Sequence, residues 1–381
     1  MLVVSCLTLL LLSALLLEAI LVRSWVRSIP TRIHVGGTRG KSSVTRYVAA
    51  ALRHHGRHVL AKITGVRPTI LRPDGTELVI HRRGPARVQE QIRMLKLAHR
   101  LRCDAVVLEC MSVAPALQEL ESRLMCPTVS VLTNIREDHR EEYGPSPEGL
   151  IEGLCAFIPR NGLLISGEIA HEHAARIHAE RQGTRVLHPT PADVEAAALL
   201  PAEAHRENAA LALAVCRELG IPEATALAGI AESARASERE LISLPIGEGV
   251  INFLNGFAVN DVPSARKFLD RWAARLGGWT SLTILLNTRT DRPYRSIQFA
   301  RWCATLPDLH CTVLLGSHAV RTRRELLLAG MDGTRVTIWT RREIADLRRH
   351  LAALQTGPRG VIVGLGNIAG DGFRILKGLG L

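Results

Sequence analysis

Aromatic residues are scarce in this chain: Phe, Trp and Tyr together make up 4% of its 381 residues. Proteins that bind single-stranded nucleic acid stack the bases on aromatic rings along a basic groove. The formal net charge of +12 favours an anionic partner, but the arginines are scattered and no aromatic platform accompanies them. We therefore expect no nucleic-acid partner, and an acidic small substrate or a membrane surface fits the charge better.

The chain also lacks any C-x-x-C pair among its eight cysteines. Cysteines at that spacing are the usual signature of zinc or redox sites. Most of these cysteines stand inside apolar runs, which is typical of reduced thiols in the core of a cytoplasmic protein. We expect neither zinc nor disulfides. The composition, with 47% hydrophobic and 22% charged residues, excludes a disordered or fibrous protein.

One long apolar run stands at the N-terminus. Leu2 to Val22 contains a single charged residue, Glu18, and at about 1.5 Å per residue a helix of this length spans a hydrocarbon core of roughly 30 Å. The start of the run is uncharged, whereas Arg23 and Arg27 follow it. The run therefore predicts a transmembrane anchor, with a single pass that leaves the N-terminus outside and the rest of the chain in the cytoplasm. A buried N-terminal helix is the alternative that Glu18 leaves open.

Beyond residue 29, short β-branched runs alternate with amphipathic stretches, which indicates an α/β fold with a mostly parallel sheet. The expected strands cover residues 32–35, 58–64, 104–110, 128–134, 162–166, 184–187, 249–254, 281–286, 311–316, 335–340 and 360–366. The expected helices cover residues 42–55, 86–102, 205–220 and 222–234, and a hairpin is expected around Pro73-Asp74-Gly75. In the second helix, Val88, Ile92, Leu95 and Leu101 share one face. The pattern restarts after a boundary near residues 237–249.

A glycine-rich loop follows the first expected strand. The residues Gly37-Thr38-Arg39-Gly40-Lys41-Ser42 stand between a strand and a helix, where main-chain N–H groups and a helix N-terminus bind phosphate. Lys41 would reach the β and γ phosphates, and the Ser42 hydroxyl would hold Mg²⁺. The longer form G-x-x-x-x-G-K-[ST] fails, because Val35 stands at its first glycine. The loop predicts a nucleotide site.

Polar residues end the two strands that should lie beside this loop. Glu109 ends one strand, and the stretch TNIREDHREEYG, with Asp138 next to His139, follows the next one. Ligands in open parallel sheets bind at the carboxyl ends of the strands, so these side chains are candidate metal or phosphate ligands. Taken singly, a strand-end glutamate such as Glu109 is more often a cap or ion pair, and the Asp-His pair is explained equally well by a surface turn; together with the loop, both support the site.

The order of these motifs, completed by HRENAALALAVCRELGI, resembles that of the ATP-dependent Mur ligases and folylpolyglutamate synthetases. The resemblance covers most of the chain after the apolar run. Within that superfamily, LECMSV, NGFAVNDVPSA, NTRTDRPYRS and GLGNIAGDG are most similar to the poly-γ-glutamate synthase ligase subunit of the CapB/PgsB type. The resemblance implies a transmembrane anchor at 1–28, a Mur-ligase-like P-loop domain at 29–240, and a smaller Rossmann-like α/β domain at 241–381 that closes over the nucleotide.

The resemblance also implies ATP and Mg²⁺ as cofactors and assigns roles to single residues. The catalytic positions correspond to Lys41, Glu109 and His139, and the metal positions to Ser42, Glu109 and His139. The implied nucleotide contacts are Gly37, Thr38, Arg39, Gly40, Lys41, Ser42, Ser43, Asn134, Asp138, Asn208, Asn260, Asp291 and Arg292. The helix that contains Asn208 is equally typical of an alanine-rich helix that packs in the core without contacting a nucleotide. The chain departs from the family pattern at two points. Gly256 stands where the family usually has an acidic residue, and no lysine lies between residues 96 and 267 to match the carbamylated lysine of many members.

The activity that the resemblance implies is phosphorylation of a glutamate carboxylate by ATP and attack of a glutamate amine on the acyl phosphate. The product would be poly-γ-glutamate made at the membrane, with small membrane subunits as partners and an oligomeric enzyme. Candidate carboxylate clamps are Arg67, Arg82, Arg83 and Arg87, with a solvated basic face as the alternative. Two other functions stay open: a membrane-tethered P-loop ATPase that energises a transport complex, and another Mur or folylpolyglutamate-type ligase.

Overall fold

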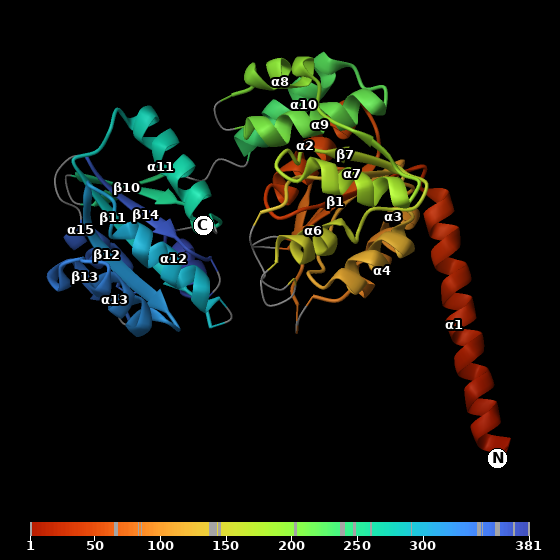
Figure 1. Cartoon of the computed structure of the whole chain (residues 1–381), viewed down its shortest axis with the longest axis horizontal. Helices are drawn as coiled ribbons and strands as arrows, with labels where there is room; N and C mark the ends of the chain where they lie inside the picture. Colours follow the sequence, from red (N-terminus) through yellow and green to blue (C-terminus); the bar gives the residue numbers. More distant parts are fainter. Residues whose placement is uncertain are drawn as a thin grey trace. The chain divides into compact units, whose positions relative to one another are not determined.

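The computed structural model describes residues 2–64, 68–82, 84, 86–136, 143, 146–201, 204–236, 241–246, 249–259, 261–290, 292–340, 344, 346–354, 359–368 and 370–379. The chain divides into two compact units, Met1–Ser237 and Glu238–Leu381, and each is built around one sheet (Figure 1). The division into an anchor, an ATP-binding domain and a closing domain stays a prediction. The predicted site residues Asp138, His139, Asn260 and Asp291, and the candidate clamps Arg67 and Arg83, lie outside the described residues.

Helix α1 (Leu2–Ser28) contains the predicted apolar run and projects away from the rest of the first unit (Figure 1). The leucines from Leu7 to Leu17 are between 52% and 69% exposed. The alternative of a helix buried in the core of its own chain is therefore wrong, because such a helix would cover its leucines. By length and composition α1 is able to cross a membrane.

The C-terminal end of α1 is docked on the first unit. Val22, Val26 and Ile29 are buried together with Met94 and Leu95 of helix α3 (Gln89–Arg100). Beside them, Ser28 Oγ and His99 Nδ1 lie 2.8 Å apart, and Lys96 Nζ lies 5.6 Å from the centroid of the Trp25 ring. The apolar helix is thus attached to α3 by packing and polar contacts.

The sheet of the first unit has eight strands in the order β4-β3-β2-β5-β1-β6-β7-β8. Neighbouring strands pair in parallel, except that β3 pairs antiparallel with both β2 and β4. The strands are β1 (Thr31–Gly36), β2 (Val59–Ile63), β3 (Thr69–Leu71), β4 (Glu77–Val79), β5 (Ala105–Glu109), β6 (Val129–Leu132), β7 (Leu163–Ser166) and β8 (Arg185–Leu187). Val35 of β1 stands opposite both Glu109 and Val131. The carboxyl ends of β5, β1 and β6 therefore meet at one edge of the sheet.

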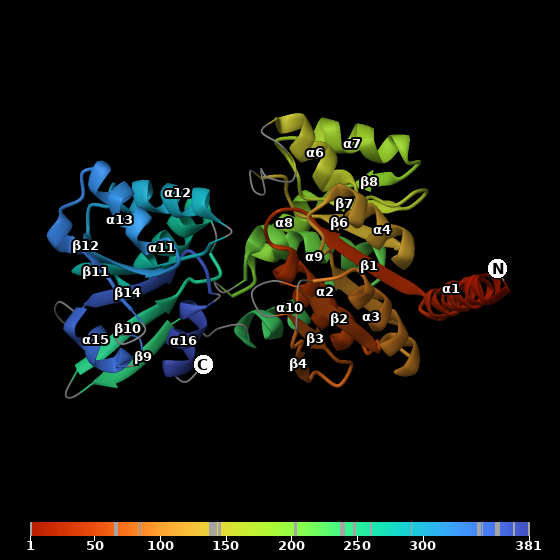
Figure 2. The same cartoon turned by 90° about the horizontal axis from the view of Figure 1, so that it is seen from below.

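Helices cover both faces of this sheet (Figure 2). Helices α2 (Lys41–His54), α9 (Arg206–Glu218) and α10 (Glu223–Ala236) bury one face, and α3, α4 (Pro115–Met125) and α6 (Pro147–Cys155) pack on the other. The unit also contains α7 (Glu172–Arg181) and α8 (Pro191–Ala198). Because the strands are buried on two sides, they are apolar almost throughout. The α/β fold with a mostly parallel sheet is confirmed.

The second unit contains a six-stranded sheet in the order β13-β12-β11-β14-β10-β9. The strands are β9 (Leu241–Ile246), β10 (Gly249–Asn255), β11 (Ser281–Thr288), β12 (Leu309–Gly316), β13 (Val336–Ile338) and β14 (Gly360–Leu365). Helices α11 (Val262–Leu276), α12 (Pro293–Cys303) and α13 (Ala319–Leu328) pack on one face, and α15 (Leu347–Leu354) and α16 (Asp371–Gly378) on the other. The five predicted strands are confirmed. The sequence prediction missed β9, which pairs antiparallel with β10 inside the segment assigned to the boundary.

Candidate functional site

The glycine-rich loop joins β1 to α2, and two of its glycines are required by its shape. Gly37 and Gly40 have φ values of 111° and 83°, in the left-handed region that other residues avoid. A Cβ atom on Gly37 would lie 2.3 Å from Thr133 Oγ1, and one on Gly40 would lie 2.4 Å from Asn208 Oδ1. Gly40 is also the N-cap of α2, and no side chain of the described residues caps that helix. Its first N–H groups are therefore available to phosphate.

Asn134, just after β6, holds the loop in this shape. The main-chain N–H groups of Thr38 and Arg39 donate to its carbonyl oxygen at 2.9 Å and to its Oδ1 at 3.1 Å. Its Nδ2 donates in turn to the carbonyl of Arg39 at 3.0 Å. A predicted nucleotide residue thus contacts the loop itself, at the base of the segment that continues into Asp138 and His139.

The side chain of Ser42, at the end of the loop, meets Glu109 at the adjacent strand end. The Ser42 hydroxyl donates to Glu109 Oε2 at 2.8 Å, and the main-chain N–H of Thr64 donates to the same oxygen at 2.8 Å. Lys41 Nζ donates to the carbonyls of Gly37 at 2.6 Å and Thr38 at 3.2 Å. A hydroxyl and a carboxylate are the hard oxygen ligands that Mg²⁺ takes, so Ser42 and Glu109 fit that ion.

Asn208 lies in the first turn of helix α9, and the structure bears on both interpretations of this helix. Ala209 and Ala210 are buried in the core, as expected of an alanine-rich packing helix. Asn208 itself is half-buried, and its amide lies directly against Gly40. The structure therefore places Asn208 against the glycine-rich loop, and its contact with the nucleotide stays a prediction. Ser43, in the first turn of α2, is also half-buried.

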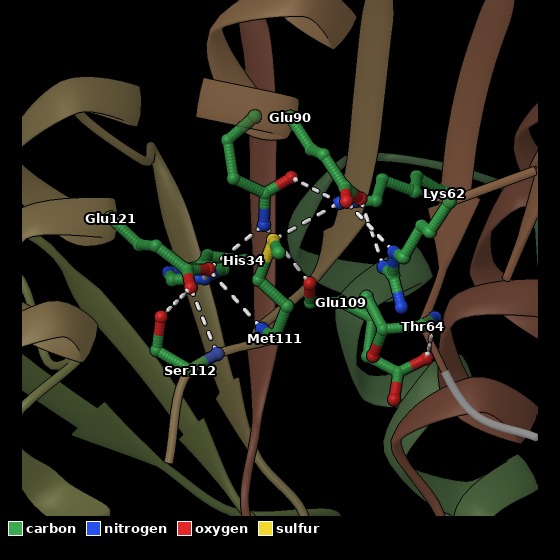
Figure 3. A network of polar contacts seen from close by, with 10 residues as sticks. His34, Lys62, Thr64, Glu90, Glu109, Met111, Ser112 and Glu121 are labelled. Atoms are coloured by element: carbon green, nitrogen blue, oxygen red, sulfur yellow. Dashed lines mark hydrogen bonds and ion pairs between the residues drawn. The ribbon is translucent and has the colours of Figure 1, made fainter. Parts of the chain in front are cut away.

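A buried polar network lies behind Glu109 (Figure 3). Lys62, on β2, is fully buried, and its Nζ lies 3.1 Å from Glu90 Oε2. It also contacts Gln91 Oε1 at 3.4 Å and Met111 Sδ at 3.2 Å. Burial lowers the pKa of the Lys62 ammonium, and the attraction of Glu90 offsets part of this effect. The sequence prediction missed this network completely.

Arg82 belongs to the same network and is not an open carboxylate clamp. Its Nε and Nη2 donate to the two carboxylate oxygens of Glu90 at 2.7 and 2.9 Å. Glu90 occupies the Nε–Nη2 edge of this guanidinium, so Arg82 pairs with a buried carboxylate of its own chain and does not belong to a solvated basic face. Burial raises the pKa of Glu90, but the hydrogen bonds from Arg82 and the charge of Lys62 outweigh it, so the pKa falls below its usual value. Arg87 is exposed.

Glu121, on α4, is the second buried carboxylate of the network. It accepts hydrogen bonds from the main-chain N–H groups of Met111 at 3.2 Å and Ser112 at 2.9 Å, and from Gln91 Nε2 at 2.8 Å. The Ser112 hydroxyl donates to it as well, and His34 Nε2 lies 3.5 Å away. Burial raises the pKa of Glu121, but the interaction with the nearby His34 and the hydrogen bonds from Ser112 and Gln91 outweigh it and lower the pKa to about 2. Glu121 is therefore a permanent anion at neutral pH.

The chain matches two family descriptions in succession. Residues 35–157 match the "Mur ligase middle domain", and residues 243–380 match the "Poly-gamma-glutamate synthase CapB C-terminal domain". The chain belongs to the CapB family of Mur-ligase-like proteins. The phosphate loop and Glu109 lie within the first match.

Relatives of this CapB-family chain agree with the assignment. It is 30% identical to "Capsule biosynthesis protein CapB" of Bacillus anthracis over 72% of this chain and 61% of the relative, so the match spans about three-fifths of the relative's length. It is 29% identical to "PGA synthase CapB" of Bacillus subtilis over 76% of this chain and 75% of the relative. The fold is similar to that of a Yersinia pestis folylpolyglutamate synthase/dihydrofolate synthase, solved with AMPPNP and a Mn ion. That match has a TM-score of 0.69 and 16% identity and covers 94% of this chain and 91% of that one.

The CapB-type second unit contains a small pocket lined by Arg289, Arg292 and Arg295 around the start of α12. The pocket is also lined by Leu286, Asn287, Ser296, Phe299, Gly366 and Asn367. Asn287 Nδ2 donates to the carbonyl of Asn367 at 2.6 Å, which joins the ends of β11 and β14. Described residues of the stretches NTRTDRPYRS and GLGNIAGDG, which are distant in the sequence, thus line one pocket. Arg292, a predicted nucleotide residue, lies in it.

Proposed function

We propose that this chain is an ATP-dependent carboxylate–amine ligase that joins glutamate units into poly-γ-glutamate. The observation that carries this proposal is the contact of the Ser42 hydroxyl with the Glu109 carboxylate, 2.8 Å apart, beside the phosphate loop. A loop with Lys41 and a strand-end carboxylate is what transfer of a phosphoryl group from ATP requires. The CapB relatives and the glutamate polymer named in the family description support glutamate as the substrate.

The proposed reaction has two steps. A carboxylate oxygen of one glutamate attacks the γ-phosphorus of ATP, so that an acyl phosphate forms and ADP leaves. The amine of a second glutamate then attacks the acyl carbon, the amide bond forms, and phosphate leaves while the amine loses a proton. Because the intermediate forms on the substrate, no side chain of the protein acts as a covalent nucleophile.

The protein's own residues act on ATP by position and charge. The N–H groups of the loop and of α2, with Lys41, hold the β and γ phosphates in line for attack. Ser42 and Glu109, with His139, would hold Mg²⁺, which spreads the negative charge that develops on the transferred group. Gly40 lets Asn208 approach the loop, and Asn134 fixes the loop's main chain.

We propose that the arginine pocket of the second unit binds an anionic group of the nucleotide. Arg289, Arg292 and Arg295 place three permanent positive charges around one small pocket, and guanidinium groups bind phosphate through paired hydrogen bonds. The family resemblance, which assigns Arg292 and Asp291 to the nucleotide, supports the same ligand.

We propose further that α1 anchors the enzyme in a membrane, with the N-terminus outside and both units in the cytoplasm. The exposed leucines of α1 and the arginines that follow them support this orientation. Synthesis beside the membrane would deliver an exported polymer directly to small membrane subunits. These partners and an oligomeric state are part of the proposal.

The decisive experiment is mass spectrometry of the products that membranes containing the full chain form from ATP, Mg²⁺ and L- or D-glutamate. The membranes are tested with and without small membrane partner subunits. The variants are Lys41→Ala and Glu109→Gln, and the matched control is Glu119→Gln, an exposed acid of α4 that pairs with Arg123. We expect a ladder of glutamate-spaced masses with γ linkages that both site variants abolish and the control keeps. ATP hydrolysis that ignores glutamate, with no ladder, would contradict the proposal and favour the transport ATPase.

A further inference from the structure

The main chain of Glu109 is held by a residue that the proposed chemistry does not use. Gln91, on α3, is fully buried. Its Nε2 donates to the main-chain oxygen of Glu109 at 3.1 Å and to Glu121 Oε2 at 2.8 Å. A single side-chain amide therefore joins the strand end that presents the Glu109 carboxylate to the buried anion on α4.

Glu121 holds the turn that follows Glu109. Its carboxylate accepts from the N–H groups of Met111 and Ser112 and from the Ser112 hydroxyl, and Figure 3 shows these groups converging on it. Hydrogen bonds to an ionised carboxylate are roughly twice as strong as those between neutral groups. Any other main-chain path after Glu109 would break several of these hydrogen bonds.

The three residues His34, Cys110 and Glu121 bring one donor atom each within 4.8 Å of one another, but the cluster does not suit a cation. A carboxylate has about four acceptor sites. In Glu121, Oε1 accepts from Ser112 N and Oγ, and Oε2 accepts from Gln91 Nε2 and Met111 N. These donors use the whole capacity of the carboxylate, so its role is to hold the chain.

We infer that Gln91 and Glu121 are positioning residues that fix the Glu109 carboxylate for metal binding. Ser42 and Thr64 hold the side chain of Glu109, and Gln91 and Glu121 hold its main chain and the turn behind it. The inference rests on the proposed metal role of Glu109. Outer partners of metal ligands typically change metal affinity 10–100-fold when removed, and we expect an effect at the lower end of that range.

The test compares two buried glutamines in the full chain, purified in detergent. Gln91→Met removes the amide that contacts Glu109. Gln118→Met is the matched control, because Gln118 is 3% exposed and its Nε2 also makes two hydrogen bonds, to Val113 O and Tyr143 Oη, both at 2.9 Å. The first readout is Mn²⁺ affinity in the presence of a nonhydrolysable ATP analogue, measured by electron paramagnetic resonance. The second is the Mg²⁺ concentration that gives half-maximal ATP turnover.

We expect Gln91→Met to weaken Mn²⁺ binding and raise the half-maximal Mg²⁺ concentration about tenfold. The KM for glutamate should not change, and Gln118→Met should stay within about twofold of the unaltered protein. Equal behaviour of the two glutamine variants would overturn the inference. Glu109→Gln is measured alongside: if it weakens Mn²⁺ binding while Gln91→Met does not, only the positioning role fails. If Glu109→Gln binds Mn²⁺ normally, the metal assignment fails and the positioning role with it.

A second pair keeps the test valid should Gln91→Met not fold. Glu121→Gln keeps the shape of the side chain but can no longer accept all four hydrogen bonds. Its control is Asp193→Asn, at a carboxylate that is 5% exposed and belongs to the capping box of α8 with Thr190. Weaker Mn²⁺ binding in Glu121→Gln alone supports the inference, and equal affinity in the pair overturns it.

Discussion

The two partners of the buried Lys62–Glu90 ion pair should contribute very unequally to the free energy of unfolding. The side chain of Lys62 is fully buried, and its ammonium lies 3.1 Å from Glu90 Oε2. Glu90 has a second cation, because Arg82 donates to it through two hydrogen bonds and is itself 21% exposed. Glu90→Gln therefore leaves the Lys62 charge buried without its paired anion. Lys62→Met leaves Glu90 paired with Arg82.

The magnitudes follow from this asymmetry. Removing one partner of a buried ion pair costs about 3–5 kcal/mol, and we expect about 3 kcal/mol for Glu90→Gln because the amide oxygen still accepts a hydrogen bond. Lys62→Met removes the cost of burying a charge and keeps most of the volume, so its effect should stay within about 1 kcal/mol. The sign of the pH dependence is also fixed. Burial holds the folded pKa of Lys62 below 10.5, so the deficit of Glu90→Gln should shrink as the pH rises towards 10.5 and the folded lysine loses its proton.

The assay is hydrogen–deuterium exchange of peptides from β2 and β5, in the full chain near neutral pH. Exchange of these core strands reports the free energy of opening of the first unit. Glu119→Gln serves as the control, since Glu119 pairs with Arg123 on the surface and such pairs contribute about 0–1 kcal/mol. A cost for Lys62→Met equal to that of Glu90→Gln, or greater, would refute the reasoning.

Three further predictions address the loop, the second buried carboxylate and the second unit. Gly40→Ala should weaken ATP binding at least tenfold, because φ is 83° and the new Cβ would lie 2.4 Å from Asn208 Oδ1. Gly56→Ala, with φ of 84° and open surroundings, shares only the backbone cost of about 1–2 kcal/mol, so normal binding by Gly40→Ala would contradict this account. The fall of the Glu121 pKa from 4.5 to about 2 corresponds to about 3 kcal/mol of stability. That contribution is complete above pH 4.5 and is lost as the pH falls towards 2. The free energy of unfolding, measured by urea titration across this range, should therefore depend less steeply on pH for Glu121→Gln than for the unaltered chain. Identical slopes would contradict a contribution from the Glu121 carboxylate. Arg295→Ala should raise the KM for ATP about tenfold, since a hydrogen bond to a charged group contributes about 1.5–3 kcal/mol, whereas Arg301→Ala, on an arginine that is 70% exposed, should leave it unchanged.

The sequence predicted well the features that local pattern determines. The apolar run, the phosphate loop, the hairpin around Pro73-Asp74-Gly75 and the strand ending at Glu109 all lie where expected. Each is encoded by residues that are neighbours in the chain, such as Gly75, whose φ of 84° suits a turn. The sequence analysis placed no helix at residues 191–198, which form α8, although Thr190 and Asp193 form a capping box. That pair is the signal that would have identified the helix.

The buried network could not be predicted from periodicity. The expected apolar face of α3 included Ile92 and Leu101, which are only half-buried, whereas Glu90 and Gln91 are buried. Periodicity assigns polar residues to the solvent, so it fails where buried polar groups pair with one another. One signal was available in β2: a lysine between Ala61 and Ile63, inside a strand buried on both faces, requires an anionic partner. The identity of that partner depends on the tertiary structure.

Helix α3 links the two features that were predicted separately, the apolar anchor and the nucleotide site. Its N-terminal turn supplies Gln91, which contacts the main chain of Glu109. Its C-terminal half buries Val26 and contacts the end of α1 through Lys96 and His99. A flexible tether would not need these contacts, because a linker that only connects two parts requires sufficient length and no packing. Helix α1, the proposed anchor, therefore joins the first unit through the same helix that supports the proposed metal carboxylate, so α3 contacts both the end of α1 and the main chain of Glu109.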